Sequence, residues 1–459
     1  MSLDPRTRAF AEQFRGRPRA ILEESQRSAL LQQLRRLSSV PFFAERLRPI
    51  SDDLDNAGPL DLARFAELVP TMTKADVLSD QEKNSPWGSR LAVDPNLLRE
   101  ATLTNGTSGT GREAFGLTAE DVYLNALSGV LLMEWAGLGH SHTTANLFPV
   151  GFGLAGLAAS HAADVLGWNI VQTGFLGTRE KLEAFRRFGV DVLWVCTPSY
   201  LARLIVEARE SGGLEQVKVV MLAGEAYPPE FVDAIEDEFG FRLIEAYGST
   251  QLAVFGGGTC PDTLNTTASS RLLHVLEPWI LAEVLGSDGA PVDDGEEGEL
   301  VVTPLYRMAS PVLRFRTGDK VRLLPAGSCG CGRPFRLIEA GTIGRIDDMI
   351  KVKGVNLWPT AVDHILLAIP DSVDYSAEVG IDGDGREFIR ATIATTRSYS
   401  AVEIDAVTER LRSATGLHID VGSRVVTAHD LRAEAGHKSR RWSDSRQETL
   451  GRLALGSSQ

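Results

Sequence analysis

Cysteine is scarce in this chain, and long apolar runs are missing from it. Four cysteines among 459 residues are too few for the disulfide framework of a small secreted protein. No window approaches the roughly 20 consecutive apolar residues that a membrane-spanning helix needs. The first 22 residues hold five arginines but no apolar stretch, so we expect no signal peptide. These absences predict a cytoplasmic protein with no membrane partner.

Positive charge is also in deficit. The chain has 47 lysines and arginines against 61 aspartates and glutamates, a formal net charge of -14. A nucleic-acid-binding protein usually presents a basic face, so this balance argues against a nucleic-acid partner. A chain of 459 residues is too long for one compact core and predicts two or three domains. The oligomeric state stays open, a homodimer included.

Two common catalytic signatures are absent as well. No Gly-x-Ser-x-Gly segment marks a serine hydrolase, and no Gly-Lys-Ser/Thr segment marks a Walker nucleotide-binding loop. The histidines outside the cysteine-rich region have no ligand-like neighbours in the sequence. The chemistry therefore has to come from other segments.

The first hundred residues have a polar, helical pattern. Residues 28–47 place leucines and a phenylalanine near helical spacing, between arginines and glutamines. The segment 70–76, Pro-Thr-Met-Thr-Lys-Ala-Asp, predicts a turn followed by a helix that starts at a threonine.

From residue 145 onward, short apolar runs alternate with helical patterns. The runs are typical of buried strands and cover residues 145–150, 168–172, 191–196, 217–222 and 243–247. The helical patterns between them cover residues 154–166, 179–188, 200–210 and 229–238. This alternation predicts an α/β fold with a doubly wound, mostly parallel sheet and helices on both faces.

Beyond residue 278 the helical patterns become rare. Strand patterns predict a β-rich subdomain at residues 279–285, 298–303, 312–316 and 320–324. After residue 347 the chain predicts a small α+β unit, with helices at 361–369 and 402–414 and strands at 376–381, 388–395 and 423–427. We therefore expect a large domain of residues 1–344 and a small C-terminal domain of residues 345–459.

A loop rich in threonine and glycine, Thr104–Gly111, reads Thr-Asn-Gly-Thr-Ser-Gly-Thr-Gly. Glycines let backbone amides turn toward an anion and hydroxyl groups add donors, so the composition suits phosphate groups. The same composition also suits a polar surface loop. The loop by itself leaves both interpretations open.

Three further segments follow the loop. Tyr247–Gln251, Tyr-Gly-Ser-Thr-Gln, ends a predicted strand, at the edge where open α/β sheets bind ligands. Arg316–Asp319 reads Arg-Thr-Gly-Asp, and Gly344–Gly354 begins Gly-Arg-Ile-Asp-Asp. In this order and spacing the four segments resemble the adenylate-forming enzymes, in particular the branch of the phenylacetate–coenzyme A ligases. The resemblance covers nearly the whole chain.

The resemblance implies a reaction in two steps. ATP and an aromatic carboxylate give an aryl-adenylate, which then passes to coenzyme A as a thioester. The first step must hold three phosphates, stabilise charge at the α-phosphate and place the carboxylate in line. The residues that the resemblance places around ATP are Thr104, Gly106, Thr107, Ser108, Gly109, Thr110, Ala223, Gly224, Glu225, Tyr247, Gly248, Ser249, Asp319 and Arg345.

The resemblance also implies individual roles around the nucleotide. Tyr247 would stack near the adenine, and Thr250 would reach a phosphate as part of the catalytic set. Asp319 would accept hydrogen bonds from both ribose hydroxyls, for which a carboxylate is the natural acceptor. Arg345 would make a second contact to ribose or phosphate.

Three roles fall in the predicted small domain. Asp347 would be the hinge on which a mobile small domain swings between the two half-reactions. Gly354 would line the coenzyme A tunnel. Lys438, three residues before Arg441, would be the catalytic lysine that bridges the carboxylate and the α-phosphate. One residue separates Lys438 from the preceding glycine, whereas the two are adjacent in the family.

The sequence departs from the family pattern at two other positions. Arg112 stands where a lysine often follows the phosphate loop. Gln251 stands where the family has a glutamate that helps to hold magnesium. An amide oxygen can coordinate a cation but brings no charge, so we expect weaker Mg²⁺ binding through this residue.

The acyl pocket implied by the resemblance is bounded by residues 148–153, 173–175 and 223–224 and by Tyr247. These segments are glycine-rich and apolar, which suits a flat ring better than a long fatty chain. The residues placed in the pocket are Phe152, Gly153, Thr173, Gly174 and Tyr247.

Three of the four cysteines fall around the Arg-Thr-Gly-Asp segment, together with a histidine: Cys260, His274, Cys329 and Cys331. Three thiolates and one imidazole satisfy tetrahedral zinc with no open position, so such a metal would be structural. The Cys-x-Cys gap is short for a zinc site, and unrelated loop residues are the alternative. Some members of the resembled branch carry a similar cluster, which favours zinc. Cys196 lies in an apolar run and predicts a buried core thiol.

Two alternatives to the coenzyme A ligase remain open. The adenylate could pass to the thiol of a carrier protein acting in trans, or to an amine. The second alternative is not an enzyme: the protein could be a nucleotide-binding regulatory protein that has lost catalysis. Gln251 motivates this hypothesis.

Overall fold

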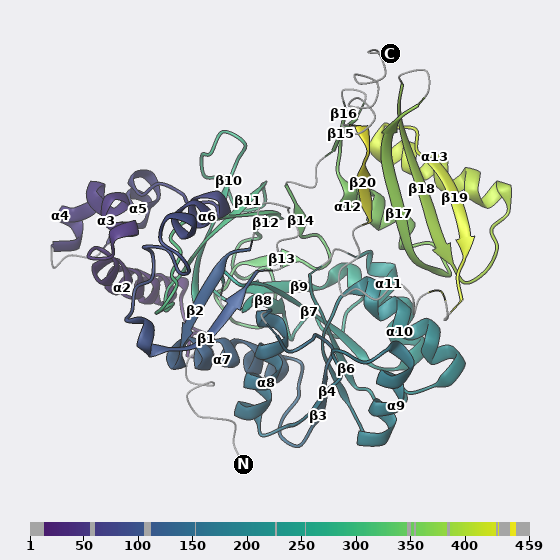
Figure 1. Ribbon diagram of the computed structural model, residues 1–459, viewed down its shortest axis with the longest axis horizontal. Helices are drawn as coiled ribbons and strands as arrows, with labels where there is room; N and C mark the ends of the chain where they lie inside the picture. Colours follow the sequence, from purple (N-terminus) through teal and green to yellow (C-terminus); the bar gives the residue numbers. More distant parts are fainter. Residues whose placement is uncertain are drawn as a thin grey trace.

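The structure, a computed structural model, describes residues 13–55, 60–104, 112–151, 153–224, 227–252, 254–346, 350–352, 355–382, 386–427, 430 and 441–446. Figure 1 shows a large lobe, which holds the N-terminal helices and most of the strands, and a smaller lobe formed by the C-terminal part. No helix in these ranges is both long and apolar enough to cross a membrane.

An eight-stranded sheet forms the centre of the large lobe, with the strand order β13-β9-β8-β7-β6-β5-β3-β4. Strands β4, β3, β5, β6 and β7 pair in parallel, and β8, β9 and β13 continue the sheet in antiparallel fashion. Their bounds are β3 Thr143–Asn146, β4 Asn169–Gln172, β5 Val192–Cys196, β6 Val219–Leu222, β7 Arg242–Ser249, β8 Val254–Thr259, β9 Leu272–Val275 and β13 Leu337–Glu339. The α/β fold with a mostly parallel sheet is therefore confirmed.

Helices cover both faces of this sheet because strand side chains alternate between two hydrophobic cores. Val192 and Trp194 of β5 pack in the core that also holds helices α7 (Ala119–Trp135) and α8 (Leu154–Leu166). Leu193, between them, packs in the core of helices α9 (Thr178–Phe188), α10 (Pro198–Ser211) and α11 (Pro229–Phe239). Period-two alternation in buried strands produces this doubly wound arrangement.

The N-terminal helices are α2 (Arg19–Leu37), α3 (Pro41–Leu47), α4 (Ser51–Asp55), α5 (Leu62–Leu68) and α6 (Lys74–Lys83). The pattern at residues 28–47 is split, because α2 ends before Pro41, which can begin a helix but not continue one. Helix α6 begins where the threonine pattern predicts. Thr73 caps it, and Asp76 completes the capping box.

A second sheet packs beside the first, with the antiparallel order β10-β11-β12-β14. Its strands are β10 Ile280–Leu285, β11 Glu297–Pro304, β12 Phe315–Arg322 and β14 Gly344–Arg345. The patterns at 312–316 and 320–324 predict two strands, whereas the structure has the single strand β12 across the Arg-Thr-Gly-Asp segment. A register shift opposite Glu299 and Val301 lets Gly318, with φ +72°, remain inside the strand.

Several elements of the large lobe have no counterpart in the sequence prediction, and helix α7 and the β1–β2 hairpin are two examples. Helix α7 is apolar almost all round, so it lacks the polar stripe that marks a surface helix. The hairpin of β1 (Leu98–Leu103) and β2 (Ala114–Thr118) carries the threonine-rich loop between its strands.

The small lobe has its own hydrophobic core, which includes Val362, Val379, Ile393 and Leu411. Its elements are β15 Ile350–Val352, β16 Val355–Leu357, α12 Pro359–Leu366, β17 Ser372–Ile381, β18 Glu387–Thr395, α13 Ala401–Thr415, β19 Asp420–Val425 and β20 Trp442–Asp444. A small apolar cluster, with Val206 of α10 and Val373 of β17 among its members, joins this lobe to the large one.

Glu245 of β7 is a buried acid whose ionisation opposes folding. Its Oε2 atom accepts hydrogen bonds from the Tyr227 hydroxyl at 2.6 Å and from the Gly341 amide at 2.8 Å. Burial raises the pKa of Glu245 from 4.5 to about 7, and these two bonds oppose the rise. The folded protein therefore holds more protons than the unfolded chain between these two values, so stability falls as pH rises through that window.

We predict that Glu245→Gln removes this loss, because an amide oxygen in place of Oε2 keeps both hydrogen bonds without a charge. The wild-type cost above pH 7 is about 3 kcal/mol. Relative to wild type, the melting temperature of the variant should rise between pH 5 and pH 8. Glu230→Gln, at an exposed site on α11, is the matched control. Parallel melting curves for Glu245→Gln and wild type across this range would contradict the prediction.

Candidate nucleotide and metal sites

The side chains of Tyr247, Asp319 and Arg345 meet in one cluster, although they come from three different strands. The Tyr247 hydroxyl donates to Asp319 Oδ2 at 2.6 Å. Arg345 Nη1 donates to Asp319 Oδ1 at 2.9 Å and to the Thr317 carbonyl at 2.6 Å. The cluster thus ties β7 of the parallel sheet to β12 and β14 of the second sheet.

Asp319 is held tightly by its own strand as well. Its amide donates to the Thr317 hydroxyl at 3.0 Å, and its side chain is 14% exposed. Gly318 makes this approach possible, because a Cβ atom there would lie 2.6 Å from Arg345 Nη2. The result is a carboxylate fixed at the edge of the parallel sheet.

Burial raises the pKa of Asp319 above its usual value, while Arg345 and the Tyr247 hydroxyl oppose the rise. Burial and the neighbouring Asp319 raise the pKa of Tyr247 well above 10, so its hydroxyl keeps its proton and remains a donor. Each carboxylate oxygen of Asp319 accepts one protein bond and retains a further lone pair. The arrangement can therefore accept two more hydrogen bonds, one at each oxygen.

The ends of the threonine-rich loop are tied together and attached to β7. The Thr104 amide donates to the Glu113 carbonyl at 3.0 Å, and the Glu113 amide donates to the Thr104 hydroxyl at 2.9 Å. Gln251 Nε2 donates to Glu113 Oε2 at 2.7 Å. The stem of the loop and the Tyr247–Gln251 segment therefore lie side by side.

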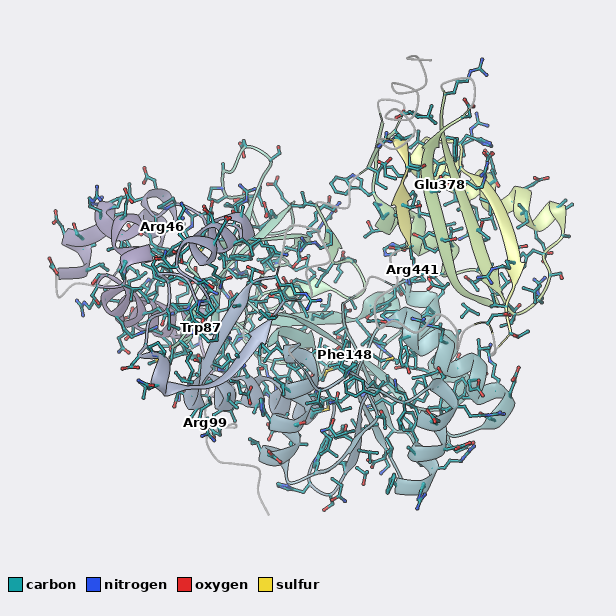
Figure 2. All side chains as sticks on the ribbon, viewed as in Figure 1. Arg46, Trp87, Arg99, Phe148, Glu378 and Arg441 are labelled. Atoms are coloured by element: carbon teal, nitrogen blue, oxygen red, sulfur yellow. The ribbon has the colours of Figure 1, made fainter. Side chains whose placement is uncertain are left out.

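The segments of the predicted acyl pocket also lie together. A Cβ atom on Gly174 would lie 2.3 Å from the Phe148 carbonyl oxygen, so only glycine fits there. Thr173 is fully buried and donates its hydroxyl to the Asn146 carbonyl at 2.9 Å. Gly153 precedes α8 as its N-cap. Figure 2 labels Phe148, which lies near the centre of the large lobe.

Strand β6 ends directly before Ala223 and Gly224, two of the predicted ATP-site residues. Ala223 donates its amide to the Cys196 carbonyl at 3.0 Å, and Gly224 adopts φ +85°. Gly248 and Ser249 close β7, and Thr250 begins the turn that leads to β8. All these positions stand at or just beyond the carboxyl ends of parallel strands.

Several predicted site residues lie outside the described residues. They are Gly106, Thr107, Ser108, Gly109, Thr110, Phe152, Glu225, Asp347, Gly354 and Lys438. Arg441 is the next described residue after Lys438. It is 9% exposed, and its Nε lies 2.6 Å from Asp374 Oδ1, so Arg441 itself is anchored to β17 of the small lobe. Figure 2 labels Arg441.

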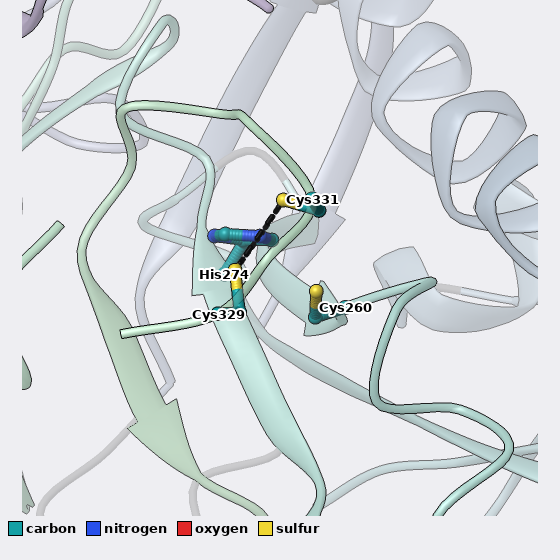
Figure 3. A group of neighbouring side chains, drawn as sticks. All are labelled: Cys260, His274, Cys329 and Cys331. Atoms are coloured by element: carbon teal, nitrogen blue, oxygen red, sulfur yellow. Dashed lines mark hydrogen bonds between the residues drawn. The ribbon is translucent and has the colours of Figure 1, made fainter. Parts of the chain in front are cut away.

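The four residues of the predicted zinc cluster converge from separate parts of the chain (Figure 3). Cys260 follows β8, His274 lies on β9, and Cys329 and Cys331 lie in the loop between β12 and β13. Their ligand atoms all lie within 4.8 Å of one another, and three of the residues are buried. His274 Nε2 is 3.1 Å from Cys331 Sγ and 3.5 Å from Cys329 Sγ.

These separations fit one tetrahedral metal ion. With zinc–sulfur bonds of about 2.3 Å, neighbouring sulfur ligands stand roughly 3.8 Å apart. The Cys329 and Cys331 sulfurs are 3.3 Å apart, and the Arg333 amide points at Cys331 Sγ from 3.4 Å. Three sulfurs and one ring nitrogen leave no position open for substrate.

The cluster also anchors the N-terminal segment. Arg15 Nε donates to the Cys331 carbonyl at 3.2 Å, and the Gly16 amide donates to the Gly332 carbonyl at 2.7 Å. The aromatic ring of Phe335 contacts both His274 and Phe14. The loop that carries two of the cysteines is therefore part of the packing between the helices and the sheet.

Glu113 and Asn146 also belong to this region, although no sequence pattern indicated either of them. Asn146 ends β3 and bonds three neighbours, through Nδ2 to the Gly156 carbonyl and Gln172 Oε1 and through Oδ1 to the Phe148 amide. Glu113 is an acid placed directly before an apolar strand, and that placement was the available signal. Neither residue belongs to a motif that its neighbours in the sequence reveal.

Comparison with known proteins agrees with this geometry. The AMP-binding enzyme family matches residues 117–305, which include the Tyr247 segment. The phenylacetate-coenzyme A ligase of Thermus thermophilus is 28% identical over 361 residues, 77% of each chain. The enzyme of the same name from Escherichia coli is 28% identical over 399 residues, 83% of this chain and 86% of that one.

Among solved structures, a 2-hydroxyisobutyryl-CoA ligase in the postadenylation state has a TM-score of 0.82 and covers 97% of this chain and 94% of its own. It is 18% identical, so this likeness speaks for the fold alone. The sequence matches support the adenylate-forming enzymes as the class of protein to which this chain is similar, and the fold agrees. Within that superfamily, the similarity is to the branch of the phenylacetate-coenzyme A ligases.

We predict that Asp319→Ala weakens ATP binding by at least tenfold, because a charge-assisted hydrogen bond contributes about 1.5–3 kcal/mol. Isothermal titration calorimetry with ATP measures the loss of affinity. The ATP affinity of Asp319→Asn should lie between those of Asp319→Ala and wild type. Glu297→Ala, at a half-exposed acid on the neighbouring strand β11, is the control. An unchanged affinity in a folded Asp319→Ala protein would remove this residue from the nucleotide site.

We predict one zinc ion per chain in protein purified without chelator, measured by elemental analysis. Removing the zinc should lower the melting temperature, because a closed thiolate site stabilises the fold. The double substitution Cys329→Ser/Cys331→Ser should lose the metal, whereas Cys196→Ser, at the fourth cysteine, should keep it. Well under one zinc per chain in wild type, or full zinc in the double variant, would leave the four residues without a metal role.

Proposed function

We propose that this protein uses ATP to activate an aromatic carboxylic acid as an aryl-adenylate, with release of pyrophosphate, and then transfers the aryl group to coenzyme A. The observation that carries the proposal is the cluster of Tyr247, Asp319 and Arg345 at the carboxyl edge of the parallel sheet. Its support comes from the relatives, which are named phenylacetate-coenzyme A ligases and match most of the chain.

In this proposal Asp319 accepts the two ribose hydroxyls, one at each carboxylate oxygen. Arg345 neutralises the buried carboxylate and keeps it ionised, which preserves it as an acceptor. The ring of Tyr247 lies against the adenine, while its hydroxyl is occupied by Asp319. The nucleoside is thus oriented by side chains that the fold already holds in place.

The phosphates extend from this cluster toward the stem of the threonine-rich loop. Thr104 and Thr250 offer hydroxyl donors there, and Thr107, Ser108 and Thr110 add others. Lys438 bridges the carboxylate and the α-phosphate during adenylation. The small lobe turns about Asp347 for the second step, in which Gly354 lines the path of coenzyme A.

The acid lies between the Phe148–Gly153 and Thr173–Phe175 segments. The Gly174 backbone packs directly against the backbone at Phe148, so the two segments would bound the aromatic ring from neighbouring sides. Mg²⁺ would be held near Gln251 and would offset charge on the phosphates. Zinc would occupy the Cys260, His274, Cys329 and Cys331 cluster and stabilise the fold without contacting substrate.

The test separates the two half-reactions. A panel of aromatic carboxylic acids is screened by ATP–pyrophosphate exchange, and coenzyme A is then offered to the adenylate. Lys438→Ala should lose exchange by at least a hundredfold yet still convert synthetic aryl-adenylate to the thioester, because its lysine serves only the first step. Arg440→Ala, in the same basic segment, is the matched control and should retain exchange.

The results of this test identify the acceptor of the aryl group. Consumption of the adenylate by a pantetheinylated carrier protein or by an amine, but not by coenzyme A, would replace the second half-reaction. Absence of exchange with every acid would contradict the proposal as a whole and favour a nucleotide-binding regulatory protein. Equal loss of both half-reactions in Lys438→Ala would contradict the role given to that lysine.

A further inference from the structure

The position of Glu113 suggests a role that no motif assigns to it. Glu113 directly precedes β2, at the stem of the loop that Thr104 closes from the other side. The next residue, Ala114, is held by Gln81, whose side chain donates to its carbonyl at 2.6 Å and accepts from its amide at 3.1 Å. The backbone position of Glu113 is therefore fixed by its own bonds to Thr104 and by the bonds of Gln81 to the next residue.

The Glu113 side chain is buried beside Gln251. The residue is 1% exposed, and its Oε2 accepts the 2.7 Å bond from Gln251 Nε2. Its other oxygen, Oε1, is also buried but has no hydrogen-bond partner among the described residues. A buried carboxylate oxygen without a partner is costly unless a cation neutralises it.

Two basic residues whose charge acts on Glu113 do not pair with its Oε1 atom. Lys74 and Arg90 act on Glu113 through their charge, but no salt bridge joins either of them to it in the described part of the chain. The Arg90 Nη2 atom donates instead to the Ala114 carbonyl at 2.6 Å. Oε1 thus remains available to a small cation.

Carboxylate and amide oxygens are the ligands that Mg²⁺ prefers in proteins. Gln251 turns its amide nitrogen toward Glu113, so its oxygen is the atom left for another contact. The pair therefore offers one charged and one neutral oxygen ligand in place of a single glutamate. These donors fit a divalent cation that arrives with ATP.

We propose that Glu113 supplies the negative charge of the magnesium site in this protein, with Gln251 holding it in place and adding a neutral oxygen. The inference rests on the proposed function, because ATP brings the cation. It also means that the amide at position 251 does not remove the charge from the site. The charge comes instead from the residue before β2, 138 positions earlier in the chain.

The competing role for Glu113 is a structural one, in which its charge only neutralises that of Arg90 and Lys74. A charge swap separates the two roles. Glu113→Gln removes the carboxylate. The double variant Glu113→Gln/Gln251→Glu places a carboxylate at position 251 and an amide at position 113, so the hydrogen-bonded pair is kept with its two groups exchanged. The swap restores a metal ligand but leaves position 113 itself without charge.

The experiment measures ATP binding by calorimetry in EDTA and in excess Mn²⁺, without any carboxylic acid. The ratio of the two affinities is the coupling between metal and nucleotide, and it is independent of turnover. Glu113→Gln should lower this ratio by at least tenfold while ATP affinity in EDTA stays within twofold of wild type. The swap variant should recover the ratio to within threefold. Glu120→Gln, at an exposed acid at the start of α7, is the control and should leave it unchanged.

Three results would overturn the inference: an unchanged ratio in Glu113→Gln, an equal loss of affinity with and without metal, or a folded swap variant that does not recover. Paramagnetic relaxation of water protons by bound Mn²⁺ gives a second readout, which should fall in Glu113→Gln and return in the swap variant. Failure of the proposed function appears separately, as absent pyrophosphate exchange in a wild-type protein that still couples Mn²⁺ to ATP.

Discussion

The candidate site depends on the hydrogen bonds that the Asp319 carboxylate accepts. This carboxylate receives the Tyr247 hydroxyl on one oxygen and the Arg345 guanidinium on the other. Because these partners lie on β7 and β14, one buried charge joins the parallel sheet, the second sheet and the strand that leads to the small lobe. Such a carboxylate is stable only while all its partners are present, since burial alone would favour its neutral form. The geometry at this edge is thus set before any nucleotide binds.

The parallel sheet explains why so many polar segments meet at one edge. Strands β3, β5, β6 and β7 run in the same direction, so the segments after them emerge side by side. Their faces are committed to two hydrophobic cores, which leaves the strand ends as the place for polar chemistry. Close backbone packing, as at Gly174, then fixes the distance between neighbouring segments.

Two other clusters of polar side chains lie in the large lobe, apart from the Asp319 carboxylate. The four residues of the cysteine-rich cluster lie close enough for one metal ion, and the same loop holds Arg15 and Gly16 of the N-terminal segment. The buried Glu113 and the half-buried Gln251 form a second pair, which connects the stem of the threonine-rich loop to the end of β7. Both clusters join segments far apart in the sequence, so each restrains the large lobe as well as offering ligands.

The sequence by itself determined the α/β class, because apolar runs of strand length alternating with helical patterns allow few other folds. It also placed helices α8 to α11 within one or two residues, since glycines and prolines mark their ends. It could not predict α7, whose apolar surface shows no period, or the β1–β2 hairpin, whose strands are short. Within the candidate site, local motifs named Tyr247, Asp319 and Arg345 one by one, but only the tertiary structure brought them within hydrogen-bonding distance of each other. Only the structure placed Glu113 against Gln251, because a contact across 138 residues depends on strand packing and leaves no local pattern.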